Sequence, residues 1–100
     1  MRRSEHWNDI KSDQLNRRYG MSLDQFNEML QLQENLCAMC GLPLEIGTRR
    51  VVVDHDHDSG AIRGIIHASC NFILGISGDD ASVLRKGMAY LLHWKKVLSS

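Results

Sequence analysis

The sequence lacks net charge, long apolar runs and a rich supply of aromatic residues. Its 12 basic and 12 acidic side chains cancel, which argues against a uniformly basic nucleic-acid binder. No signal-peptide core and no membrane-spanning run is present, so we expect a soluble, intracellular (cytoplasmic) protein without membrane contacts. Only 6% of the 100 residues are aromatic, and a chain this short buries a small core, so a bound metal ion would help to hold the fold.

Cysteine is also scarce, and the three cysteines are an odd number, which argues against a closed disulfide framework. They fall instead into two short-spaced pairs that include one histidine, Cys37-x2-Cys40 and His67-x2-Cys70, with 26 residues between Cys40 and His67. Two turns that each supply two ligands suit one tetrahedral ion, and a closed set of nitrogen and sulfur ligands favours structural Zn²⁺. Two alternatives stay open. Either His67 is an ordinary histidine and another group is the fourth ligand, or the cysteines are small buried hydrophobic residues.

The charges are unevenly distributed although they cancel. The last twenty residues carry Arg85, Lys86, Lys95 and Lys96 and no acid, whereas the acids gather in the middle of the chain. Basic ends around an acidic centre suit a protein that holds a polyanion at its flanks and a cation at its centre. Solvated helix faces are the alternative interpretation of the same charges.

Capping signals and apolar periodicity divide the chain into short elements. Ser22 with Gln25 three residues later forms a capping box, and apolar residues then recur at helical spacing. A β-branched run at 51–53 and turn residues at 58–60 predict a hairpin. In order, we expect a polar N-terminal arm (1–11) and one domain (12–100) with helices at about 12–19 and 23–33, a hairpin at about 50–66, a short helix at about 70–75 and a C-terminal helix at about 80–98.

The C-terminal helix is expected to start at a capping Asp79 or Asp80. It carries leucines on more than one side, which is more apolar surface than a small core can cover. These leucines are Leu84, Leu91, Leu92 and Leu98. We therefore hypothesise a homodimer formed through the terminal helices. The alternative is that both sides of the helix pack within one chain.

An alternating cluster of acids and histidines, Asp54-His55-Asp56-His57, follows the β-branched run. In a continuing strand the two acids would face one way and the two histidines the other. Carboxylates suit Mg²⁺ or Mn²⁺, a neutral imidazole takes a proton from water, and the carboxamide oxygen of Asn71 can be a second ligand. The pattern predicts a single-metal site for phosphodiester hydrolysis, in which His55 activates water and Asp54 and Asn71 hold the ion. The alternatives are a polar turn that binds nothing and a Ca²⁺ site, although the spacing differs from that of an EF-hand loop.

A family resemblance rests on three stretches: LNRRYGMSLDQFNEML, CAMCG and VVDHDHDSGAIRGIIHASCN. Together they resemble the phage recombination endonuclease VII family, within the His-Me finger (ββα-metal, HNH-like) nucleases, over roughly residues 15–92. By position, Asp54 and Asn71 match the family's catalytic metal ligands, His55 its general base and His57 a further active-site histidine. His67 stands where the family has the third zinc cysteine.

The resemblance implies an α+β fold, a small zinc-stabilised ββα-metal domain with flanking helices. It also implies a metal-dependent DNA endonuclease, with structural Zn²⁺ and catalytic Mg²⁺ or Mn²⁺, encoded by a phage or a bacterial host. The enzyme would nick or cut DNA, with branched DNA among the candidate substrates. The alternative hypothesis is a non-catalytic zinc-binding module that docks nucleic acid or protein through its basic helices.

Overall fold

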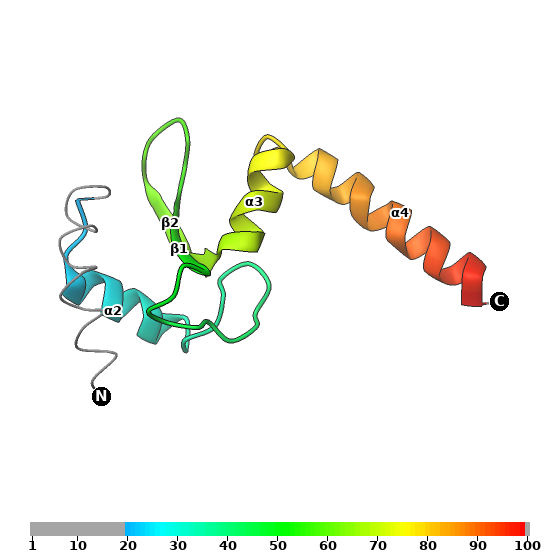
Figure 1. Cartoon of the computed structure of the whole chain (residues 1–100). Coiled ribbons are helices and arrows are strands. Elements are labelled where there is room, and N and C mark those ends of the chain that lie inside the picture. The colour runs from blue at the N-terminus through cyan, green and yellow to red at the C-terminus, as the bar shows by residue number, and fades with distance from the viewer. Residues whose placement is uncertain (1–19, 100) are drawn as a thin grey trace.

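The computed structural model describes residues 20–99 as a helix, a hairpin and two further helices (Figure 1). The elements are α2 (Leu23–Leu32), β1 (Val51–His55), β2 (Ile62–His67), α3 (Ala68–Ile76) and α4 (Ala81–Ser99). The expected N-terminal arm and the expected helix at 12–19 lie outside the described residues. A hairpin that runs directly into a helix, beside a cluster of three cysteines and one histidine, confirms the predicted α+β, ββα class.

Helix α2 begins at the predicted capping box. The Ser22 hydroxyl accepts a hydrogen bond from the Gln25 backbone N–H at 3.1 Å, and the Gln25 side chain accepts one from the Ser22 N–H at 2.9 Å. The helix ends one residue before the expected position 33, because Glu34 and Asn35 adopt positive φ angles of 55° and 60° that a helix does not allow.

The hairpin pairs β1 and β2 in antiparallel register, with Val53 opposite Ile65 and Asp54 opposite Gly64. The register shifts between Asp54 and His55, and β1 ends at His55. Because β1 ends at His55, the strand alternation that would place the two acids on one face and the two histidines on the other does not continue through the cluster. Asp54 stays in the strand and is buried, whereas Asp56 lies in the turn, where its carboxylate accepts hydrogen bonds from the Ser59 N–H and hydroxyl.

The core lies where α2, the hairpin and the start of α3 meet. Its buried members come from each of these elements and from the connecting loops: Met21, Phe26, Leu30, Cys37, Leu44, Val51, Val53, Ile65, Ile66 and Cys70. Two of the three cysteines are thus core residues as well as candidate ligands. The metal cluster and the hydrophobic core are one continuous structure, so loss of either is expected to disturb the other.

The outer edge of β2 is covered by a side chain and a loop in place of a third strand. The Gln33 side-chain amide accepts a hydrogen bond from the Ile65 N–H at 2.9 Å and donates one to the Ile65 carbonyl at 2.8 Å. The Ala38 N–H donates to the same carbonyl at 3.1 Å. Gly64 permits this close approach, because a Cβ at that position would lie 3.0 Å from the Ala38 Cβ.

Helix α3 follows β2 without a connecting loop. His67 is its N-cap in an extended conformation, and the Ala68 N–H donates to the Arg50 carbonyl at 2.7 Å. The helix therefore starts two residues earlier than expected and ends at Ile76 instead of 75. It packs against both strands of the hairpin, and Asn71 is its fourth residue.

Helix α4 projects away from the rest of the molecule (Figure 1). Asp80 caps it by accepting hydrogen bonds from the Ser82 N–H and hydroxyl, whereas Asp79 lies in the preceding turn at φ 60°. No residue of this helix is buried. The structure therefore does not support the alternative in which both apolar sides of the helix pack within one chain. Between residues 20 and 99, no helix combines the length and apolarity needed to cross a bilayer.

Candidate metal centre and candidate active site

The four predicted zinc ligands meet at the junction of the Cys37–Cys40 loop with the end of β2 and the start of α3. The ligand atoms of Cys37, Cys40, His67 and Cys70 all lie within 4.8 Å of one another. The Cys37 and Cys70 sulfur atoms are 3.8 Å apart. This equals the edge of about 3.8 Å that a tetrahedron of sulfur ligands has around Zn²⁺ at bond lengths near 2.3 Å. The donor set and its spacing therefore fit a structural zinc ion.

The orientation of His67 supports its role as the fourth ligand. Its Nε2 lies 2.9 Å from the Pro43 carbonyl oxygen, and its Nδ1 lies 3.2 Å from the Cys40 sulfur. A carbonyl can only accept, so Nε2 carries the proton and the lone pair of a neutral ring is on Nδ1, which points into the cluster. Zinc-binding histidines are commonly fixed by such a hydrogen bond from their second nitrogen. The alternative of an ordinary histidine is disfavoured by this arrangement.

The surroundings of the cluster also favour the ionised form of one thiol, that of Cys37. Burial raises the pKa of Cys37, but the backbone N–H groups of Cys40, His67 and Met39 outweigh burial and lower that pKa to about 6. Burial, followed by the neighbouring Cys40 and Cys37 sulfur atoms, raises the pKa of Cys70 to about 12. A second thiolate beside the first is unfavourable without a cation between them, which is the charge that a zinc ion supplies.

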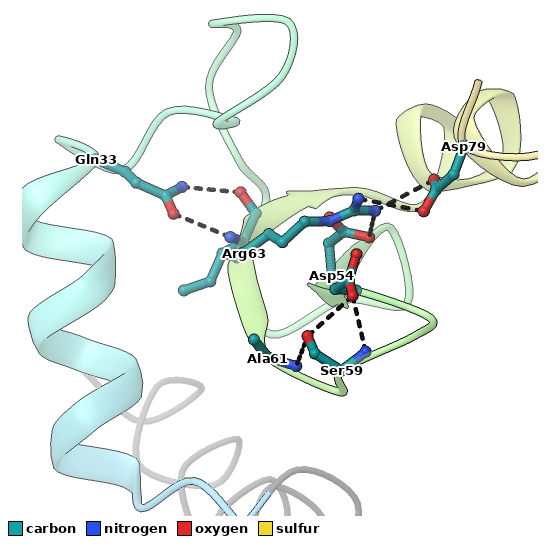
Figure 2. A network of polar contacts seen from close by, with 8 residues as sticks. Gln33, Asp54, Ser59, Ala61, Arg63 and Asp79 are labelled. Carbon is teal, nitrogen blue, oxygen red and sulfur yellow. Dashed lines mark hydrogen bonds and ion pairs between the residues drawn. The ribbon is translucent and has the colours of Figure 1, made fainter. Parts of the chain in front are cut away.

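Asp54 lies in β1 and is paired with an arginine of the neighbouring strand β2. Arg63 Nε donates to Asp54 Oδ2 at 2.7 Å and Arg63 Nη2 donates to Oδ1 at 3.0 Å. The same guanidinium contacts Asp79, with Nη1 3.2 Å from Oδ2 and Nη2 3.3 Å from Oδ1. Figure 2 shows Arg63 held between the two carboxylates. The hydrogen bonds to Asp54 and then to Asp79 raise the pKa of Arg63 above its ordinary value, so the arginine stays charged.

The remaining predicted active-site residues are His55, His57 and Asn71. His55, the last residue of β1, is exposed and follows the buried Asp54 directly. The rings of His55 and His57 are neighbours, with centroids 5.5 Å apart. Asn71 is exposed in the first half of α3. The carboxylate of Asp54 and the carboxamide of Asn71 are oxygen donors, the ligand type that Mg²⁺ and Mn²⁺ prefer.

Sequence reasoning missed Arg63 and Asp79. The sequence pattern places Arg63 only within the predicted hairpin (50–66) and indicates Asp79 only as one of two candidate caps of the C-terminal helix. Only a partial signal was present: a buried carboxylate in a hairpin needs a cationic partner, but the register that decides which residue is the partner is not fixed by the local sequence. A polar groove of about 480 Å³ lies beside them, lined by Asp56, His57, Asp58, Arg63, Gly75, Gly78 and Asp79.

Comparison with known proteins gives one family and two curated relatives. Residues 12–93 match the family model described as recombination endonuclease VII. The "Gene 59 protein" of Mycobacterium phage L5 is 30% identical over 76 residues, which cover 75% of this chain and 46% of that protein. The "Gene 59 protein" of Mycobacterium phage D29 is 33% identical over 75 residues, which cover 73% of this chain and 44% of that protein. The chain thus spans less than half the length of these relatives. No solved structure matches it significantly.

Proposed function

The chain belongs to the recombination endonuclease VII family, as its sequence motifs predicted, and on that premise we propose that it is a DNA endonuclease that depends on a divalent metal ion. It hydrolyses phosphodiester bonds by nicking or cutting, and branched DNA is a candidate substrate. Cys37, Cys40, His67 and Cys70, whose ligand atoms lie together, hold a structural Zn²⁺, and Asp54 and Asn71 hold a catalytic Mg²⁺ or Mn²⁺.

The observation that supports this proposal most directly is the change of environment between two adjacent residues. Asp54 is 6% exposed, whereas His55, immediately after it, is exposed at the register shift of the hairpin. A buried carboxylate is suited to hold an ion in a fixed place, and an exposed imidazole is suited to meet water and DNA. His57 lies beside His55 and is the further active-site histidine of the proposal.

The chemistry divides between the ion and the side chains. A bound Mg²⁺ or Mn²⁺ would polarise the scissile phosphate and stabilise the leaving oxygen. The His55 imidazole takes a proton from the attacking water, which typically contributes a factor of ~10²–10⁴ to the rate. Asp54 and Asn71 orient the ion, and α3 positions Asn71 because it packs against both strands. The structural zinc fixes the point at which β2 turns into α3.

His55→Ala tests the proposal. We expect single-turnover cleavage of supercoiled DNA to fall by ~10²–10⁴-fold, while zinc content and DNA affinity stay near the wild-type values. His93→Ala is the matched control, because His93 is an exposed histidine on α4 whose ring meets the Trp94 ring edge-to-face, away from the hairpin. Asp54→Ala should also abolish cleavage, through loss of the ion. Equal cleavage by His55→Ala and wild type would refute the catalytic assignment and favour a non-catalytic DNA-binding module.

We further propose that a second copy of the chain covers the exposed apolar surface of α3 and α4. An open groove of about 770 Å³ lies between these helices and is lined almost entirely by apolar residues: Phe72, Ile73, Ile76, Ser77, Val83, Leu84, Gly87, Met88, Tyr90, Leu91 and Leu92. A contiguous apolar patch of this kind marks an interaction site, and a 19-residue helix without a buried residue gains little stability from its own chain. A second copy offers a matching surface with two-fold symmetry.

Leu91→Glu tests the dimer. We expect sedimentation to report about twice the 11.4 kDa chain mass for wild type at micromolar concentration and the single-chain mass for the variant. Leu32→Glu makes the same substitution at a leucine of α2 that is 81% exposed and lies away from the groove, so it should stay dimeric. A wild-type mass of one chain at micromolar concentration would contradict the proposal.

A further inference from the structure

We propose that Arg63 is a positioning residue that fixes the Asp54 carboxylate and lowers its affinity for a divalent cation in the absence of DNA. The inference rests on the proposed function, since it takes Asp54 as a ligand of the catalytic ion. It assigns a role to a side chain that touches neither the ion nor the water. Its consequence is that the ion binds best together with DNA.

The hydrogen bonds from Arg63 fix the orientation of the Asp54 carboxylate. Its Nε and Nη2 atoms donate to the two Asp54 oxygens at 2.7 and 3.0 Å, and the Asp54 side chain is only 8% exposed. Two parallel hydrogen bonds between a guanidinium and a carboxylate fix both groups in one plane. Each carboxylate oxygen has two lone pairs, so one remains on each oxygen for a cation. The pairing with Arg63 therefore orients the Asp54 carboxylate and leaves it able to bind a cation.

Asp79 holds Arg63 in this position. The guanidinium lies 3.2 and 3.3 Å from the two Asp79 oxygens, on the turn between α3 and α4 (Figure 2). An arginine with only one partner could turn away when a cation approaches. With carboxylates from β1 and from the α3–α4 turn on its two sides, Arg63 stays beside Asp54. The site that the cation enters thus keeps a fixed positive charge.

That charge opposes the cation. An ion bonded to an Asp54 oxygen at about 2.1 Å would lie roughly 5 Å from the guanidinium. Repulsion between a single and a double charge at this distance weakens binding by about tenfold even at the dielectric constant of water. A DNA phosphate adds negative charge and oxygen ligands, and so restores affinity. The ion pair between Arg63 and Asp54 therefore accounts both for weak binding of the divalent cation without DNA and for its binding in the presence of DNA.

Arg63→Gln separates orientation from charge. Zinc-loaded full-length protein is titrated with Mn²⁺ alone, without DNA, by electron paramagnetic resonance, and single-turnover cleavage is then measured at saturating Mn²⁺. We expect the Mn²⁺ dissociation constant to fall by about tenfold and the cleavage rate to fall by at least tenfold. A loss of structure would weaken both properties together, so tighter binding with slower cleavage identifies a positioning role.

Two further variants complete the comparison. Arg63→Lys keeps the charge but not the two parallel hydrogen bonds, so Mn²⁺ affinity should stay near wild type while cleavage slows. Arg50→Gln removes an arginine that pairs with Glu45 on the surface and should change neither property. Unchanged or weaker Mn²⁺ binding in Arg63→Gln would overturn the proposal, as would wild-type cleavage by either Arg63 variant. If Arg63→Gln does not fold, the cleavage rate of Arg63→Lys decides.

Asp54→Ala distinguishes this inference from the proposed function beneath it. Loss of Mn²⁺ binding in Asp54→Ala, together with unchanged binding in Arg63→Gln, would overturn the role of Arg63 and leave the metal site standing. Wild-type Mn²⁺ binding by Asp54→Ala would remove the metal site itself, and the role of Arg63 with it.

Discussion

At the scale of single residues, Gly64 shows how closely β2 approaches the loop that carries the first two cysteines. We predict that Gly64→Ala lowers the melting temperature at fixed zinc concentration. An added Cβ would lie 3.0 Å from the Ala38 Cβ and 3.4 Å from the Gln33 Oε1, so the loop or the strand must shift, at a cost of about 1–3 kcal/mol. Differential scanning fluorimetry of the zinc-loaded protein measures the effect.

Gly75→Ala is the control for this prediction. Gly75 lies within α3, and nothing lies within 4 Å of where its Cβ would be. Alanine forms helix more readily than glycine by about 1 kcal/mol, so the melting temperature should stay or rise. A Gly64→Ala protein as stable as wild type would mean that the approach of β2 to the loop is looser than the structure has it.

The ion pair between Arg63 and Asp54 could not be predicted from the sequence, whereas the metal cluster could. The spacing of Cys37, Cys40, His67 and Cys70 identified the metal cluster, because the two ligands of each pair lie three positions apart and such a pair is recognised from the sequence alone. The Arg63 contact depends on the register of the hairpin, which no local pattern fixes. The same holds for Gln33, whose bonds to β2 join residues 32 positions apart.

At the scale of elements, the metal cluster joins the loop after α2 to the end of β2 and the start of α3. We predict that Cys40→Ala loses stoichiometric zinc and yields an unfolded or aggregating protein. Structural zinc contributes on the order of 10 kcal/mol to small domains, which is comparable to the whole stability of a chain this size. Elemental analysis and circular dichroism of the purified variant provide the measurement.

Met39→Ala is the matched control, because Met39 lies in the same loop between two ligands and its side chain is 41% exposed. It should retain zinc and fold. Full secondary structure in Cys40→Ala without metal would show that hydrophobic packing alone holds the fold.

Element boundaries followed from the sequence where a local signal exists. The capping box placed the start of α2, and the β-branched run placed β1. The start of α3 was missed by two residues because His67 is a candidate ligand, the last strand residue and the helix cap at once. The end of β1 at His55 could not be predicted from the sequence, because the register shift at Asp54 and His55 arises from strand pairing, not from composition.

At the scale of the whole molecule, α4 is a projecting arm with its cations in solvent. We predict that replacing Lys95 and Lys96 together with glutamine weakens DNA binding and reduces the slope of log affinity against log salt by about 2, while the single-turnover rate with saturating DNA stays the same. Arginine at both positions keeps the charge and is the control. Fluorescence anisotropy over a salt series measures both quantities, and an unchanged slope would show that α4 does not contact phosphate.

The covered outer edge of β2 has a consequence for misfolding. An open strand edge exposes unpaired N–H and C=O groups and invites other chains to extend the sheet, which is a route to aggregation. Here the Gln33 side-chain amide is hydrogen-bonded to both the backbone N–H and the carbonyl of Ile65, and the His67 N–H donates to the Cys37 sulfur at 3.4 Å. Sheet growth is blocked at this edge for as long as the loop after α2 stays in place. Release of zinc would free that loop and uncover the strand, so chelation is expected to produce fibrous or amorphous deposits in place of a soluble unfolded chain.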